Sequence, residues 1–283
     1  MDTTSRQTRA TRRSHLNDTQ SGAMATFLRW ATVFAIWGGP VILFAMWSGS
    51  SPFVRAMLLC GITLANGLYC LGTLFPALGL FGPVRCRFET AKQEVWLTLD
   101  DGPDPDLTPR VLDLLAAHGA KATFFVVGKR AAAHSVLILR MLAEGHSLGN
   151  HTQRHLSAMF WCLPWWIVGR EIDRCSETLR EICGVAPLFF RPPVGMVTPF
   201  VPPVVKRRSM DLVLWSVRGF DAMGANAETV AQRVLQQTDP GAIVVLHPER
   251  TEEGLHALSL ILDGLARRGL TCAIPEQGAL RSE

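Results

Sequence analysis

Residues 95–103 read VWLTLDDGP, an apolar run that ends in two adjacent aspartates and a turn-forming Gly-Pro pair. A short apolar run bounded by such a turn is typical of a buried strand. Successive side chains on a strand point to opposite faces, so Asp100 and Asp101 cannot both be ordinary core residues. At the end of the strand, the two carboxylates can reach one pocket from different angles.

A histidine pair follows further along the chain, in the segment HTQRH at residues 151–155. If this segment is helical, its two imidazoles project from one face and can bind a single cation. One carboxylate completes a three-ligand set, which leaves a coordination position open, as a hydrolytic zinc site requires. Taken alone, the histidines also fit a solvated helix face and the aspartates a plain turn.

Three further polar clusters come directly after strand-like runs. They lie in the segments LFFRPPVG (188–195), LWSVRGFD (214–221) and IVVLHP (243–248). Together with the aspartate and histidine segments, they give five clusters whose order and residues resemble the motifs of the NodB-type polysaccharide deacetylases, carbohydrate esterase family 4. The resemblance extends over about residues 93–275.

The resemblance implies a metal centre with a base beside it. Asp101, His151 and His155 would bind a divalent metal ion, expected to be Zn²⁺, and Asp100 would activate the attacking water. Thr152 would brace the histidine segment. The chemistry is consistent, since amide hydrolysis needs an activated nucleophile, oxyanion stabilisation and an acid for a poor leaving group.

The resemblance also assigns the remaining catalytic roles. Arg191 would orient Asp100, and the backbone amide of Val194 would stabilise the oxyanion. His247 would protonate the departing amine, with Asp221 tuning its pKa. The structural alternatives are a surface charge at Arg191 and a satisfied strand-end histidine at His247.

Four positions depart from the family's pattern, and the mildest is Val245 in place of the leucine of the fifth motif. Val194 stands in place of the usual tyrosine, which removes an aromatic wall from the sugar pocket. In the fourth motif, Arg218 replaces the first aspartate and Ala222 replaces the tryptophan. The fourth motif therefore shares the fewest residues with the family's pattern, and a loop cap is the structural alternative for Asp221.

The N-terminal part of the chain is strongly apolar. The protein has 283 residues, 48% of them hydrophobic, and a mean hydropathy of +0.19. Two stretches without charge, Trp30–Trp47 and Ala56–Val84, are each long enough to cross a hydrocarbon core of about 30 Å. A cleaved signal peptide fits two such long stretches poorly. We expect a two-helix transmembrane hairpin, and buried helices of a soluble protein are the alternative.

Basic residues predict the orientation of this hairpin. Several precede the first stretch or follow the second, whereas the connecting turn carries only Arg55. Positive charge marks the cytoplasmic side, so both termini are expected there, in a bacterial-type inner membrane with the catalytic domain facing the cytoplasm. The flanking residues are Arg6, Arg9, Arg12, Arg13, Arg85, Arg87 and Lys92.

The predicted organisation has four parts: a disordered basic tail (1–23), two membrane helices (24–84), a deacetylase-like domain (93–275) and a short tail (276–283). The net charge of +4 is too small to indicate nucleic acid as a partner. Cysteine usage does not indicate a disulfide framework.

From residue 93 onward, strand-like and helix-like segments alternate. Such repeated βα units, with polar residues after the strands, predict an α/β fold with a parallel sheet or barrel. The resemblance narrows this to a distorted, incomplete (β/α) barrel. The expected strands are 122–127, a short one at Phe189, 212–217, 242–246 and 270–274, and the expected helices are one capped by Thr108, 135–144, 171–182, 227–237 and 255–267.

An aromatic segment, MFWCLPWWIV at residues 159–168, directly follows the histidine pair. Aromatic residues beside an active site either pack in the core or enter a bilayer interface. Both interpretations are open from the sequence. If the domain is cytoplasmic, a lipid-linked sugar is expected to enter beside residues 161–168.

The leading hypothesis is a membrane-anchored, metal-dependent hydrolase that removes N-acetyl groups from an amino sugar in a polysaccharide or lipid-linked glycan. O-deacetylation and deformylation use the same metal-water chemistry and are the alternatives among enzymes. A glycan-binding module without turnover is the alternative from another class. The altered fourth motif favours that module, whereas the complete ligand set and base argue against it.

Overall fold

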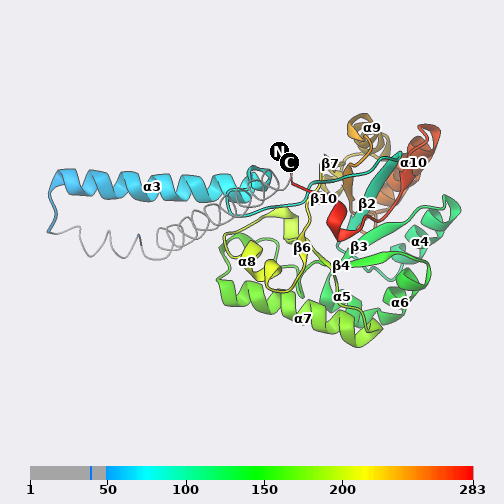
Figure 1. Cartoon of the computed structure of the whole chain (residues 1–283), viewed down its shortest axis with the longest axis horizontal. Coiled ribbons are helices and arrows are strands. Elements are labelled where there is room, and N and C mark those ends of the chain that lie inside the picture. The colour runs from blue at the N-terminus through cyan, green and yellow to red at the C-terminus, as the bar shows by residue number, and fades with distance from the viewer. Residues whose placement is uncertain (1–38, 40–48, 283) are drawn as a thin grey trace, which may run out of the picture. The chain divides into compact units, whose positions relative to one another are not determined.

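The computed structural model describes residues 39 and 49–282, which divide into two compact units (Figure 1). The first contains the described residues up to Gly82 together with Val197–Pro202. The second contains Pro83–Met196 and the chain from Pro203 onward, and all of the predicted site residues lie in it.

The first unit is built on one long helix, α3 (Pro52–Leu74), followed by a 3-10 turn, η2 (Pro76–Leu78). The helix begins with the Ser51 hydroxyl accepting a hydrogen bond from the Val54 amide and with proline at the first turn. Only 17% of its most apolar window is buried. Among the described residues, it is the one helix long and apolar enough to cross a membrane.

The predicted transmembrane hairpin is therefore only partly tested. The second apolar stretch overlaps α3, which begins at Pro52, before the predicted start at Ala56, and ends at Leu74, well before the predicted limit at Val84. The first stretch, Trp30–Trp47, and the basic tail, 1–23, lie outside the described residues. The hairpin and its orientation stay predictions.

The second unit is organised around a sheet of eight parallel strands. Seven of the strands pair in the order β6-β5-β4-β3-β2-β8-β7, and the eighth, β9, pairs with the beginning of β2. The strands are β2 (Glu94–Asp100), β3 (Ala122–Val126), β4 (Ser147–Asn150), β5 (Phe189–Phe190), β6 (Asp211–Leu212), β7 (Val217–Arg218), β8 (Ile243–Leu246) and β9 (Thr271–Cys272).

The sheet curls into an incomplete barrel. Strands β6 and β7 stand at opposite ends of the sheet, yet only residues 213–216 connect them along the chain. An extended connection of this length reaches at most roughly 17 Å. The two ends must therefore come close together without pairing, which confirms the predicted distorted, incomplete (β/α) barrel.

The alternation of side chains along β2 separates the two faces of this sheet. Val95, Leu97 and Leu99 pack in the large apolar core beneath the surrounding helices. Trp96 belongs to a second apolar cluster on the opposite face, where its indole donates to Thr123 Oγ1 at 2.7 Å. Thr98 and Asp100 continue that face toward the end of the strand.

Helices cover the outer face of the sheet (Figure 1). Two of them begin with side-chain caps, since Asn226 accepts from the Thr229 amide and Thr251 accepts from the Gly254 amide. The helices that pack on this core are α4 (Leu107–Ala117), α5 (Gly128–Ala133), α6 (Ser135–Ala143), α7 (Trp165–Cys183), α9 (Ala227–Gln237) and α10 (Glu252–Arg267). A further short helix, α8 (Val201–Lys206), follows the arginine motif and is not part of this core. A two-stranded antiparallel ribbon, β1 (Arg87–Phe88) with β10 (Leu280–Arg281), brings the described C-terminal end onto the same unit.

Several sequence predictions differ from these elements. Thr108 does not cap α4, because its side chain lies inside the fold and Asp106 occupies the cap position. Helix α7 begins at Trp165 instead of Glu171, and the helix predicted from 255 begins at Glu252. Neither β4 nor α5 was predicted, since both are short and lack a clear apolar period.

Candidate active site

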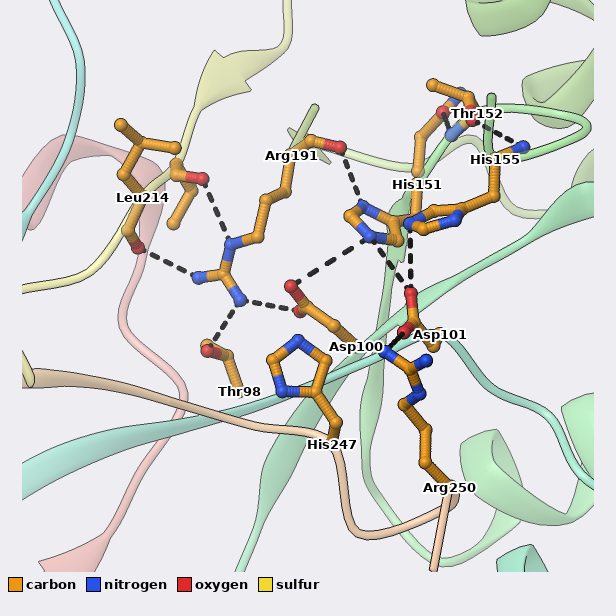
Figure 2. A network of polar contacts seen from close by, with 12 residues as sticks. Thr98, Asp100, Asp101, His151, Thr152, His155, Arg191, Leu214, His247 and Arg250 are labelled. Atoms are coloured by element: carbon orange, nitrogen blue, oxygen red, sulfur yellow. Dashed lines mark hydrogen bonds and ion pairs between the residues drawn. The ribbon is translucent and has the colours of Figure 1, made fainter. Parts of the chain in front are cut away.

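The five polar clusters meet at one edge of the sheet. Figure 2 shows Asp100, His151, Arg191 and His247 together there. Asp100 is the last residue of β2, while His151, Arg191 and His247 directly follow β4, β5 and β8. Asp221 lies in η5 (Asp221–Met223), shortly after β7. Because these strands are parallel, their carboxyl ends share one edge, where a barrel enzyme carries its catalytic side chains.

The histidine segment is a turn, so the helical conformation considered for residues 151–155 does not occur. Thr152 and His155 have left-handed backbone conformations, with φ values of 68° and 52°. The Thr152 hydroxyl accepts a hydrogen bond from the His155 amide at 3.1 Å, which confirms that it braces the segment. This turn, instead of a helix face, places the His151 and His155 rings 4.8 Å apart.

Asp101 and the two histidines form a candidate metal centre. Asp101 Oδ1 lies 3.0 Å from His155 Nε2 and 3.4 Å from His151 Nε2. One ligand atom from each residue lies within 4.8 Å of the others. The backbone of Asp101 is also left-handed (φ 76°), which turns its side chain into the pocket that Asp100 reaches from the strand.

The surroundings of these three residues fit a divalent cation. His151 Nδ1 lies 2.8 Å from the Arg191 carbonyl, which can only accept, so Nδ1 carries the proton and Nε2 presents a lone pair. Asp101 Oδ1 is buried and makes no hydrogen bond within the described part of the chain. Burial opposes ionisation of Asp101, but when the two imidazoles are protonated their hydrogen bonds and positive charge outweigh it and hold the pKa of Asp101 below its usual range.

Asp100 is held by a buried arginine. The Arg191 side chain is fully buried and its Nη1 lies 2.6 Å from Asp100 Oδ1. The same guanidinium donates to Thr98 Oγ1 at 2.8 Å and to two backbone carbonyls, those of Val213 at 3.1 Å and Leu214 at 2.8 Å. A surface charge at Arg191 is therefore wrong, and the contact suits the orienting role that the sequence predicted.

His247 and Asp221 are in direct contact. His247 Nδ1 lies 3.1 Å from Asp221 Oδ1, and the His247 amide donates to the other carboxylate oxygen. Burial lowers the pKa of His247, but the hydrogen bond to Asp221 and the nearby charge of Asp100 outweigh it and raise that pKa above its ordinary value. The pairing favours a protonated imidazole, the form that a general acid needs.

The arginine motif ends in a strained turn. Val194 has φ 53° inside η4 (Pro193–Gly195), and its side chain is half exposed. Gly195 follows with φ 73°, and a Cβ there would lie 2.4 Å from the Trp215 ring. Most of the non-glycine residues with positive φ lie in these clusters, namely Asp101, Thr152, His155, Val194 and Phe220. Such strain is concentrated at functional sites.

The structure shows what occupies the positions at which the fourth motif departs from the family's pattern. The Arg218 guanidinium lies 4.4 Å from the centroid of the Phe220 ring and 5.4 Å from that of Trp215. Stacking on aromatic rings therefore occupies the position where an aspartate was expected. Ala222 is exposed.

Sequence reasoning missed two residues, Glu249 and Arg250, that directly follow the fifth motif. Arg250 is half exposed, and its Nη1 lies 3.4 Å from Asp101 Oδ2 (Figure 2). Glu249 is buried and accepts a hydrogen bond from the Thr108 hydroxyl. A Cβ at Gly102 would lie 1.7 Å from Glu249 Oε2, so this carboxyl group packs directly under the turn that follows the two aspartates. Only the tertiary contacts identify either residue.

The aromatic segment is divided between the core and the surface. Phe160 and Val168 are buried, whereas Trp161, Trp165 and Trp166 are exposed. The core interpretation is therefore wrong for these three tryptophans.

Comparison with known proteins places the chain among enzymes of one chemistry. The family model of polysaccharide deacetylase matches residues 88–213. A peptidoglycan-N-acetylglucosamine deacetylase of Bacillus cereus is 34% identical over 181 residues, which cover 63% of this chain and 65% of that protein. A chitooligosaccharide deacetylase of Bradyrhizobium is 37% identical over 191 residues, covering 62% and 86%. A solved family 4 carbohydrate esterase from Streptomyces lividans, in complex with acetate, superposes with a TM-score of 0.61 at 26% identity, covering 66% and 95%.

Proposed function

Since this chain belongs to the NodB-type polysaccharide deacetylases of carbohydrate esterase family 4, we propose that it is a metal-dependent hydrolase that removes N-acetyl groups from N-acetylglucosamine residues of a glycan. The substrate class is suggested by the names of its relatives, which act on peptidoglycan and chitooligosaccharides.

The observation that carries this proposal is the pairing of two differently held aspartates. Asp101 faces Nε2 of both imidazoles, while Asp100 faces the buried Arg191. The first carboxylate is thus arranged as a ligand and the second as a base. A divalent ion held by Asp101, His151 and His155 would act as a Lewis acid and lower the pKa of a water molecule.

The side chains of the protein account for the proton transfers. Asp100 accepts a proton from the attacking water as its oxygen forms a bond to the acetyl carbon. The Val194 amide would donate to the oxyanion. The protonated His247 then delivers a proton to the nitrogen as the C–N bond breaks, giving acetate and a free amine.

Acetate release is the direct test. Full-length protein stripped with a chelator should not release acetate from N-acetylglucosamine oligomers, and adding Zn²⁺ should restore release. If the oligomer stays fully acetylated after the protein is reloaded with Zn²⁺ or with other divalent ions, the proposed activity is wrong. An O-acetylated and an N-formylated analogue, assayed in parallel, separate the two alternative reactions.

We further propose that the chain is anchored in a bacterial-type inner membrane with this unit in the cytoplasm. The proposal is supported by the apolar helix α3 and by the arginines on either side of the predicted hairpin. A fluorescent reporter fused after Glu283 should be active there, whereas a periplasmic phosphatase fusion should be inactive. Strong phosphatase activity would reverse the orientation.

A further inference from the structure

An exposed group of large side chains lies between the histidine turn and the body of α7. The side chains of Trp161, Trp165 and Trp166 are 45%, 57% and 49% exposed. Two of these rings meet edge to face with centroids 5.9 Å apart. With an exposed methionine and two exposed arginines they form a surface that we call the aromatic face, made of Met159, Trp161, Trp165, Trp166, Arg170 and Arg174.

The aromatic face is held outward by its own segment. Phe160, Leu163 and Val168 are buried between the exposed members and anchor the segment to the unit. The Cys162 amide donates to the Met159 carbonyl at 3.0 Å, and the Val168 amide donates to the Pro164 carbonyl at 3.1 Å. The tryptophans are therefore presented to solvent by an ordered backbone. Single exposed apolar residues are common, whereas several large ones exposed on one short ordered segment indicate an interaction surface.

The charges on the aromatic face indicate its partner. Trp166, Arg170 and Arg174 follow one another at intervals of four residues, so they lie along one line of α7. Tryptophan at one end of such a line and arginine along it is the composition of a helix that lies in a membrane interface. The arginines would meet anionic phosphates of lipid headgroups. The same chain contains α3, a helix able to cross a bilayer.

We propose that the aromatic face docks on an anionic lipid bilayer, with its tryptophan rings in the headgroup layer and its arginines on the lipid phosphates. Short hydrogen-bonded turns join this surface to the metal centre, since the Ser157 amide donates to the His155 carbonyl and the Met159 amide to the Leu156 carbonyl. Docking therefore places the histidine turn beside the membrane surface.

Docking on lipid has a consequence for the substrate, which rests on the proposed function. A sugar attached to a lipid anchor would reach Asp101, His151 and His155 while its apolar tail stays in the bilayer. The docking itself does not depend on catalysis, so it can be tested on a protein without bound metal or substrate.

The test uses full-length protein labelled with 5-fluorotryptophan and reconstituted in nanodiscs made of equal parts phosphatidylglycerol and phosphatidylcholine. Fluorine resonances are assigned by single Trp→Phe substitutions. Two paramagnetic probes are compared, a phospholipid spin-labelled at its headgroup and a water-soluble gadolinium chelate. The fully buried Trp96 is the internal control, because neither probe reaches it.

The labelled lipid should broaden the resonances of Trp161, Trp165 and Trp166 beyond detection while leaving Trp96 sharp. Replacing both Arg170 and Arg174 with Ser, or using phosphatidylcholine alone, should return most of this signal. Broadening by the gadolinium chelate without broadening by the lipid would show that the surface stays in water and would overturn the proposal. Protection from both probes would also overturn it, since a protein or a second copy of the chain would then cover the face.

Discussion

The buried carboxyl group of Glu249 should make the stability of this unit depend on pH in an unusual direction. Burial is the main cause that raises the pKa of Glu249 from 4.5 to about 7, partly opposed by the hydrogen bond from Thr108. Between these two values the folded state binds more protons than the unfolded state. The free energy of unfolding must therefore fall as pH rises from 4.5 to 7.

The size of the effect follows from the same two values. One pKa unit corresponds to about 1.36 kcal/mol, so the wild-type protein should lose roughly 3 kcal/mol of stability from this group across that range. Glu249→Gln keeps the shape of the side chain and removes its ionisation. The stability of Glu249→Gln relative to wild type should therefore rise by roughly 3 kcal/mol between pH 4.5 and pH 8.

Urea unfolding of the full-length, metal-free protein in detergent measures this difference. The variant and the wild type are followed across the pH range by tryptophan fluorescence, and the difference curve removes groups that titrate in both. Glu177→Gln, a change at an exposed position, controls for loss of a carboxylate. A difference curve that is flat between pH 4.5 and 8 would refute the reasoning, because Glu249 would then have the same pKa in both states.

Three further predictions concern the site. Arg191→Lys should lower kcat roughly 100-fold with little change in metal affinity, because a single ammonium cannot bind Asp100 and the surrounding carbonyls together; equal kcat values would contradict the orienting role. Asp221→Asn should lower the pKa of the His247 acid, so the alkaline limb of the pH–rate profile should move to lower pH. A limb at unchanged pH would show that Asp221 does not raise the pKa of the catalytic acid. Changing Trp165 and Trp166 to Ser should lower turnover of a lipid-linked N-acetylated sugar but not turnover of a short soluble analogue. The melting temperature should stay unchanged, since both side chains are exposed. Equal losses of turnover on both substrates would argue against lipid entry.

The sequence predicted the barrel because its strands have a plain signature. Several βα units place an apolar strand before a polar residue, and the run ending at Asp100 and Asp101 is the clearest case. Strand β4 was missed because SLGN has no apolar period, although this strand carries His151 to the site. Its place depends on pairing with β3 and β5, which is a tertiary property.

The site residues were found by pattern, but the way they are held was not. An HxxxH spacing suggested a helix, whereas left-handed residues at Thr152 and His155 produce the convergence. The spacing alone cannot distinguish these, because both bring the two rings together. Arg250 and Glu249 escaped notice because their contacts with Asp101 and with the turn at Gly102 join segments far apart in the chain.

The division of labour between the two aspartates is tested most directly by one measurement on Asp100→Asn. Zinc content of the full-length variant is determined by elemental analysis, beside its rate of acetate release from an N-acetylglucosamine oligomer, with His155→Ala as the matched loss of a ligand. The account predicts that Asp100→Asn binds one metal ion per chain as wild type does while its turnover falls by roughly 100-fold or more, and that His155→Ala loses both. Near-normal turnover by Asp100→Asn with its metal bound would contradict the assignment of Asp100 as the base.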